Sequence, residues 1–192
     1  NEAWVWEHLA LTRAAAIVGP DDLIRDIDGF RVALSDIRSF ATVAPALSKM
    51  RQRIFSVKSD RSAWDVKIGP GRLQDIELLS QLGSLLAGKQ DQSVLAGLMG
   101  LVDLRLIERA QADVLNAAYE QFWTLQLGTK LLSEGAFDPE IVGDGGHNFI
   151  LSLSKSETLD TLQKQTTLRE TAARSIIEAV LPEPQEDVDE RG

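Results

Sequence analysis

Apolar side chains recur at helical spacing along almost the whole chain, and this pattern constrains the fold more than any other feature. Between Leu73 and Leu86 they stand at every third or fourth position, and Gly88 follows as a stop signal. Comparable patterns run over residues 2–18, 21–40, 45–57, 93–99, 104–132 and 157–180. The sequence therefore predicts an all-α fold, an irregular up-down helical bundle.

Three places interrupt the helical pattern. Residues 64–68 (WDVKI) alternate apolar and charged side chains, which predicts at most one short extended segment. The Ala44-Pro45 pair predicts a break between the second and third helices, with Pro45 in the first turn of the third. Residues 136–148 (AFDPEIVGDGGHN) predict a surface loop, because they lack both the ending and the preceding strand of a phosphate-binding loop.

Composition limits the classes of protein to which the chain can belong. It has 192 residues, of which 44% are hydrophobic, so we expect one bundle domain over residues 1–181. Residues 182–192 hold two Pro and five acidic residues and predict a disordered acidic tail. The first residues already follow a helical pattern without an initiator Met, which suggests a piece of a longer protein.

The charge and the rare residue types exclude several partners. A net charge of −9 argues against a nucleic-acid binder, and no run of about 20 apolar residues predicts a membrane span. The chain has no Cys, and its two His have no metal-ligand spacing, so we expect no disulfide, no metal site and a reducing, cytoplasmic location.

The stretch Gly69-Pro70-Gly71-Arg72 combines turn chemistry with the start of a helix. The glycines permit unusual backbone angles, and the helix after them begins with free amide groups and carries two acidic residues in its first turns. Such a stretch is either an ordinary helix start or a helix end that faces a nucleotide or a neighbouring domain. For the second interpretation the candidate residues are Lys67, Gly69, Gly71, Arg72, Asp75 and Glu77.

Two sequence blocks resemble one known family. NEAWVWEHLALTRA at the start of the chain and WDVKIGPGRLQDIELLSQ from Trp64 resemble the helical domain of glutamine synthetase adenylyltransferase, in its carboxy-terminal, adenylylating half. The chain departs from the family pattern at Ala15, Arg72 and Leu78. The matching positions are Trp4, Trp6, Glu7, His8, Ala10, Leu11, Arg13, Ala14, Met50, Arg51, Asp65, Lys67, Gly71, Asp75, Ile76, Glu77 and Gln81.

The resemblance implies a parent enzyme that uses ATP and magnesium to adenylylate a tyrosine of glutamine synthetase. It also implies control by glutamine and by a nitrogen-signalling regulatory protein, and a nucleotidyltransferase domain as the packing partner of the bundle. Family members carry the metal-binding carboxylates on strands of that other domain. Here the two Asp-x-Asp patterns fall in a predicted helix (26–28) and in the tail (187–189), so we expect no catalytic residue and no activity in this piece alone.

Other interpretations stay open. The chain could be a regulatory protein-interaction module without nucleotide contact, or part of the related uridylyltransferase of the nitrogen-signalling protein. We interpret Trp4 and Trp6 as core or interdomain packing, because an acidic chain is a poor platform for stacking bases. We interpret Glu7, His8 and Arg13 as structural residues of the first helix, and His147 as a loop residue.

Overall fold

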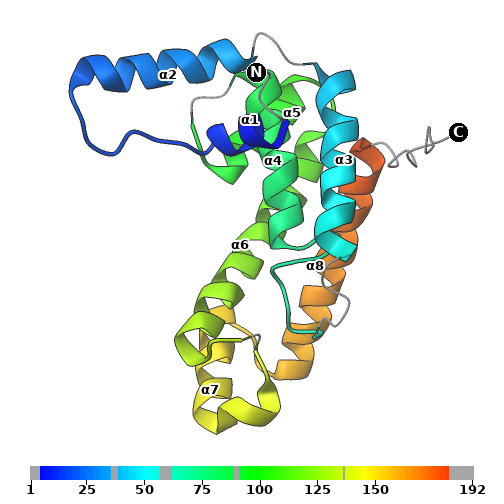
Figure 1. Cartoon of the computed structure of the whole chain (residues 1–192). Coiled ribbons are helices and arrows are strands. Elements are labelled where there is room, and N and C mark those ends of the chain that lie inside the picture. The colour runs from blue at the N-terminus through cyan, green and yellow to red at the C-terminus, as the bar shows by residue number, and fades with distance from the viewer. Residues whose placement is uncertain (1–4, 36–38, 57–61, 89–90, 136, 182–192) are drawn as a thin grey trace, which may run out of the picture.

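The computed structural model describes residues 5–35, 39–56, 62–88, 91–135 and 137–181, and all regular secondary structure in these ranges is helical (Figure 1). This confirms the all-α prediction. The helices are α1 (Val5–Leu11), α2 (Asp21–Ser35), α3 (Phe40–Ser56), α4 (Leu73–Ala87), α5 (Val94–Asp103), α6 (Arg109–Leu132), α7 (Pro139–Ser154) and α8 (Leu159–Val180). None of these helices is both long and apolar enough to cross a membrane.

Helix α4 is the centre of the bundle. It lies against α1, α2, α3, α5, α6 and α8, and Ile76, Leu79 and Leu82 on it are completely buried. Figure 1 shows α6, α7 and the first part of α8 extending away from this centre as a second, smaller group of helices. Residues from both groups form one continuous hydrophobic core.

Several predicted helix ends are confirmed. Gly88 adopts the left-handed conformation (φ 61°) directly after α4, and the Ser93 side chain accepts a hydrogen bond from the Ala96 amide at the start of α5. At the start of α8 the Thr158 side chain accepts a hydrogen bond from the Thr161 amide, so the helix begins at Leu159, close to the predicted start at residue 157. Long helix α6 begins at Arg109 and not near Leu104, because its capping box is formed by Glu108.

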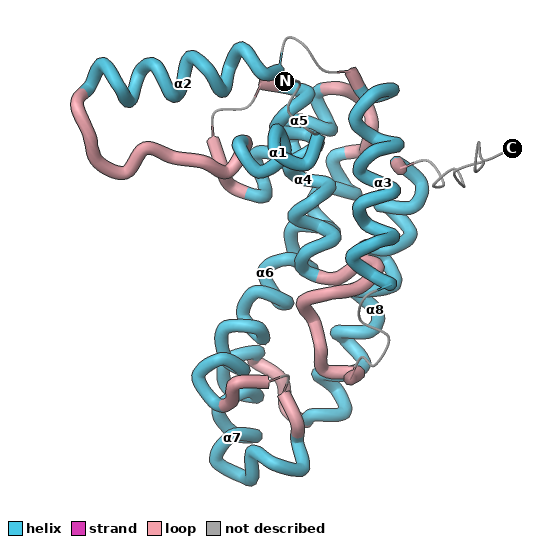
Figure 2. The backbone as a smooth tube through the Cα atoms, in the orientation of Figure 1, coloured by secondary structure: helices cyan, strands magenta, loops and turns pink. Residues whose placement is uncertain are grey.

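The extended segment predicted at 64–68 is not a strand in the described residues. The described part of the α3–α4 connection, residues 62–72, is loop and turn (Figure 2). The Asp65 carboxylate accepts a hydrogen bond from the Lys67 amide (3.0 Å), so the side chain bends its own backbone. The alternating apolar and charged residues around Trp64 therefore belong to a locally hydrogen-bonded turn and not to a strand.

Pro45 does not break a helix, contrary to the prediction. It lies inside α3, which begins at Phe40. A proline in a helix interior removes one hydrogen bond and costs about 3 kcal/mol. Here the neighbouring Val43, Ala44 and Leu47 are completely buried, and their burial offsets that cost.

The predicted loop at 136–148 is also wrong, because most of it is helical. Asp138 caps α7 by accepting a hydrogen bond from the Glu140 amide (2.9 Å), and Pro139 occupies the first helical position. The glycines place a kink in the helix at Gly143 (φ 63°, ψ −177°) instead of ending it. His147 spans this kink through a contact of 2.7 Å between its Nε2 and the Pro139 carbonyl.

The first helix ends seven residues earlier than predicted, and the chain after it leaves the bundle. The Thr12 hydroxyl donates to the Leu9 carbonyl (2.7 Å), α1 stops at Leu11, and Ile17 and Val18 are almost fully exposed. Figure 1 shows this segment and α2 projecting together from one side of the bundle. We call residues 12–35 the α2 arm.

Candidate functional site

The turn before α4 is closed by this chain's own backbone. The Leu73 amide donates to the Val66 carbonyl and the Gln74 amide to the Lys67 carbonyl, both at 3.0 Å. The Arg72 amide donates to the Gly69 carbonyl. The predicted open row of amides is therefore wrong at these positions, because residues 66–69 fold back and cap the helix.

Gly71 serves helix packing. It has a positive φ of 73°, and a Cβ atom there would lie 2.2 Å from the Glu170 carbonyl oxygen and 2.6 Å from the Arg174 amide on α8. The guanidinium of Arg72 is held in the same contact, with its Nε 3.1 Å from Glu170 Oε1, and it also donates to the Asp65 carbonyl. Only a residue without a side chain permits this approach of α8 to the turn.

Asp75 is completely buried in a bidentate ion pair. Its two carboxylate oxygens lie 2.5 Å from Nε and 2.7 Å from Nη2 of Arg51 on α3, and Oδ2 also accepts from the Gly71 amide at 2.8 Å. Arg72 and Asp75, although three positions apart, do not pair with each other in the part of the chain that the structure describes: Asp75 has the partners just named, and Arg72 pairs with Glu170. Because its oxygens are bound within the chain, Asp75 joins α3, α4 and the turn.

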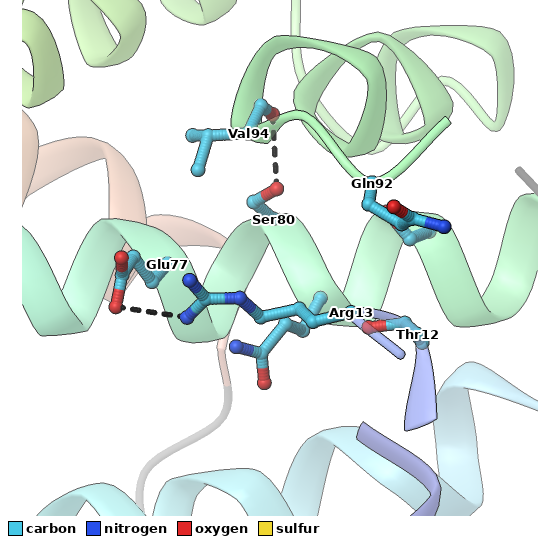
Figure 3. Close-up of a pocket in the computed structure, with 8 residues that line it drawn as sticks. Thr12, Arg13, Glu77, Ser80, Gln92 and Val94 are labelled. Atoms are coloured by element: carbon cyan, nitrogen blue, oxygen red, sulfur yellow. Dashed lines mark hydrogen bonds and ion pairs between the residues drawn. The ribbon is translucent and has the colours of Figure 1, made fainter. Parts of the chain in front are cut away.

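Glu77 is the acidic residue of this helix that meets the first sequence block. Its Oε2 lies 3.3 Å from Nη1 of Arg13, and Figure 3 shows the two side chains meeting along α4. The Arg13 side chain is about half exposed, whereas the Glu77 side chain is mostly buried. Beside them, the Ser80 hydroxyl donates to the Val94 carbonyl (2.9 Å), which ties α4 to the start of α5.

A groove opens between α1, α3 and α4 next to this ion pair. We call it the α1–α4 groove; its volume is about 360 Å³. Its walls are mostly apolar, and the polar groups gather on the α4 side. The lining residues are Trp6, Leu9, Ala10, Arg13, Met50, Ile54, Gln74, Glu77, Leu78 and Gln81.

Tyr119 on α6 reports on the charges at this groove. Burial raises the pKa of the Tyr119 hydroxyl above its ordinary value, the Glu77 carboxylate raises it further, and Arg13 lowers it. The ring of Tyr119 stacks on Trp123, with their centroids 6.2 Å apart. An aromatic pair on α6 therefore lies within electrostatic reach of the ion pair.

The predicted site residues separate into two groups. Gly71 and Asp75 are buried against this chain's own helices, Gly69 is buried in the turn, and Arg72 is largely covered by Glu170. Lys67 is exposed on the turn and is not among the residues that line the groove, whereas Glu77 lines it. The structure thus brings Glu77, and not the turn, to an accessible hollow.

The residues of the first sequence block that were interpreted as structural differ in their exposure. Trp6 is exposed over the groove, His8 is buried, Glu7 is partly exposed, and Trp4 lies outside the described residues. Sequence reasoning did not single out Leu9, Ile54 and Gln74. The usable signal was their helical spacing from Trp6, Met50 and Glu77 respectively, since residues three or four apart share a helix face.

The described residues do not fit a magnesium nucleotide. They contain no group of three His, Asp or Glu that could hold a metal ion. The amides at the start of α4 are used by the preceding turn. We therefore assign no step of nucleotide chemistry to this chain.

Comparison with known proteins places these features in context. The chain is 30% identical over 190 residues to a bifunctional glutamine synthetase adenylyltransferase/adenylyl-removing enzyme from Rhizobium meliloti, and 27% identical over 187 residues to one from Rhodopseudomonas palustris. Each comparison covers 94% of this chain and 19% of the relative. The chain thus spans about a fifth of the length of the curated relatives it matches.

A family profile described as GlnD PII-uridylyltransferase matches residues 46–138. That range includes Met50, Glu77 and Gln81 of the groove, but not Trp6, Ala10 or Arg13. The adenylyltransferase relatives match 94% of this chain, a larger share than the profile does. Over nearly its whole length the chain is therefore similar to about one fifth of a glutamine synthetase adenylyltransferase/adenylyl-removing enzyme.

Proposed function

We propose that this chain is a helical domain of an enzyme that transfers an adenylyl group from ATP to a tyrosine of glutamine synthetase. In this proposal the α1–α4 groove packs against a nucleotidyltransferase domain and completes its active site. ATP and magnesium bind to that other domain, and this chain alone is inactive. Glutamine synthetase is the substrate partner, and a nitrogen-signalling protein regulates the reaction.

One observation carries the proposal: two sequence blocks that are about sixty residues apart meet at one accessible groove. Trp6, Ala10 and Arg13 come from the first block, and Glu77 and Gln81 from the second. Buried packing explains Asp75 and Gly71, but it does not explain an exposed Trp6 or a half-exposed Arg13. A hollow with apolar walls and an ion pair at one side suits contact with another protein surface.

The test is adenylylation by the longer polypeptide that contains this chain. Labelled ATP and glutamine synthetase are supplied, and the rate is compared for wild type and Glu77→Gln. We expect the substitution to slow adenylyl transfer by about tenfold, the effect of losing one well-placed interaction. Asp75→Ala is less informative, because loss of its buried ion pair would destabilise the bundle itself.

Glu178→Gln is the matched control. Glu178 also pairs with an arginine, Arg174, but both are exposed on α8 and lie outside the groove. An unchanged transfer rate in Glu77→Gln, with only the response to the regulatory protein lost, would replace the proposal by a regulatory module. Both variants should keep the thermal unfolding midpoint of wild type within a few degrees.

A uridylyltransferase is the second candidate, because the matching profile carries that description. The same polypeptide is offered labelled UTP and the nitrogen-signalling protein in a parallel reaction. Labelling of that protein, with none of glutamine synthetase, would establish the second candidate and refute the first. The Trp6 and Arg13 block, outside the profile match, favours the adenylyltransferase.

A further inference from the structure

The α2 arm carries a helix without a sufficient partner in this chain. Arg31 is the one buried residue of α2 among those whose side chains the structure describes, and it donates to the Thr12 carbonyl at 3.1 Å. Leu23 and Phe30 are 53% and 56% exposed. Ile17 and Val18, which precede α2 on the arm, are almost fully exposed. A helix of fifteen residues is marginal in water without tertiary packing.

Leu23 and Phe30, the two most exposed of the large apolar residues described on α2, form one edge, whereas Val32 (44% exposed) lies on another side of the helix. Leu23 and Phe30 are seven positions apart, so they lie within about 20° of each other around the helix axis. Ile27 lies between this edge and Arg31, which is buried and donates to the Thr12 carbonyl at the base of the arm. Leu23, Ile27 and Phe30 therefore form an apolar strip along one side of α2.

The solvent side of this strip is acidic. Asp26 lies about 40° from Phe30 around the axis, and Asp22 lies one turn before Asp26; both are exposed. The basic residues of α2 lie elsewhere, since the buried Arg31 is held by the Thr12 carbonyl and Arg25 lies well over 90° from Phe30. A complementary surface would be an apolar depression with Lys or Arg along one rim.

We propose that the α2 arm docks on another domain of the same polypeptide, at an apolar surface with a basic rim. The inference rests on the proposed function, in which this chain is part of a longer adenylyltransferase, and it names the element that holds the domains together. In the curated relatives, about four-fifths of the polypeptide lies outside the homologous region. A covalently linked partner is present at high effective concentration, so a strip of this size suffices for docking.

Hydrogen exchange of the α2 amides tests the proposal. Exchange is measured in the 192-residue chain and in the longer polypeptide. We expect α2 to exchange at least about tenfold more slowly in the longer polypeptide, whereas the amides of α4 change little. Phe30→Glu in the longer polypeptide should return α2 to the rate of the shorter chain.

Leu168→Glu is the control substitution, because Leu168 is also exposed (70%) but lies on α8. It should leave the protection of α2 intact. Equal exchange of α2 in the two polypeptides overturns the proposal. Protection that grows with the concentration of the shorter chain alone also overturns it, because the partner is then a second copy.

The readout separates this proposal from the proposed function. A polypeptide that protects α2 but does not label glutamine synthetase refutes the enzyme activity and keeps the docking. A polypeptide that labels glutamine synthetase with an unprotected α2 refutes the docking alone. Asp26→Lys in the longer polypeptide should reduce the protection of α2 amides only partly. Because the cause is charge repulsion, which salt screens, this loss of protection should become smaller as salt is added.

Discussion

The α4–α5 pair and the α2 arm show two ways of using an amphipathic helix. In the first, Gly83, Gly97 and Gly100 bring the two backbones into contact, so that a Cβ on Gly83 would lie 2.0 Å from the Gly97 carbonyl oxygen. On the arm, a Cβ on Gly29 would meet no atom within 4 Å. Glycine is therefore required by the packing of α4 on α5, but not by the packing around α2.

The two regions differ in where the partner lies and not in the sequence pattern. Both α2 and α4 carry apolar residues at helical spacing, and the pattern predicted a helix for each. The partners of α4 are in this chain and bury most of its apolar residues, whereas α2 keeps its apolar edge in water. A helical pattern thus predicts that a face needs cover, but not which polypeptide supplies it.

The largest expected difference between the regions comes from their Arg–Asp pairs. Asp75→Asn leaves Arg51 with a buried, unbalanced charge, and we expect a loss of about 3–5 kcal/mol in unfolding free energy. Asp28→Asn is the matched change on the arm. Asp28 is exposed and lies 3.4 Å from Arg31, so its loss should cost less than about 1 kcal/mol.

Chemical denaturation of both variants measures this difference. At about 2–4 °C per kcal/mol, Asp75→Asn should also lower the melting temperature clearly more than Asp28→Asn does. Equal losses would mean that the arm is held as firmly as the core. That result would contradict the contrast between the two regions.

The paired glycines give the next largest effect. Gly83→Ala forces α4 and α5 apart and should destabilise the chain by about 1–3 kcal/mol. Gly29→Ala places a better helix former at an open position and should stabilise α2 by up to about 1 kcal/mol. Thermal melts of the two variants should therefore shift in opposite directions, and a shared direction would show that α2 is already constrained.

The sequence predicted elements well where the signal is local. Gly88 and Ser93 mark real helix ends, because capping depends on the residue itself and its immediate neighbours. It failed where packing decides. Pro45 sits inside a helix because buried neighbours outweigh its cost, and the first helix ends at Leu11 because apolar residues as far along as Val18 stay exposed and gain nothing from helical packing.

The site was predicted in part, for the same reason. The two blocks identified Trp6, Arg13 and Glu77, which meet at the groove. They could not show that Asp75 pairs with Arg51 or that Gly71 lies under α8, because both contacts join segments far apart in the chain. A turn rich in glycine suits a phosphate and a crossing helix equally well, and the sequence does not distinguish them.

The smallest expected effect concerns the junction of the two regions, where Arg13 begins to leave the bundle. Tyr119 is the only tyrosine of the chain, so its tyrosinate absorbance is an unambiguous reporter. Removing the carboxylate in Glu77→Gln should lower the Tyr119 pKa, and removing the cation in Arg13→Gln should raise it. Titration of the folded variants under alkaline conditions measures both shifts, and shifts in the same direction would contradict the ion pair.

The same titration connects the junction to stability and to the arm. Because folding raises the Tyr119 pKa above its ordinary value of 10.0, the folded chain holds this proton more tightly than the unfolded chain does. The corresponding stability is complete below about pH 10 and is lost as the pH rises through the folded pKa. If docking of the arm draws Arg13 away from Glu77, the Tyr119 pKa should rise toward that of Arg13→Gln. A Tyr119 pKa that is unchanged by docking would show that the arm moves independently of the groove.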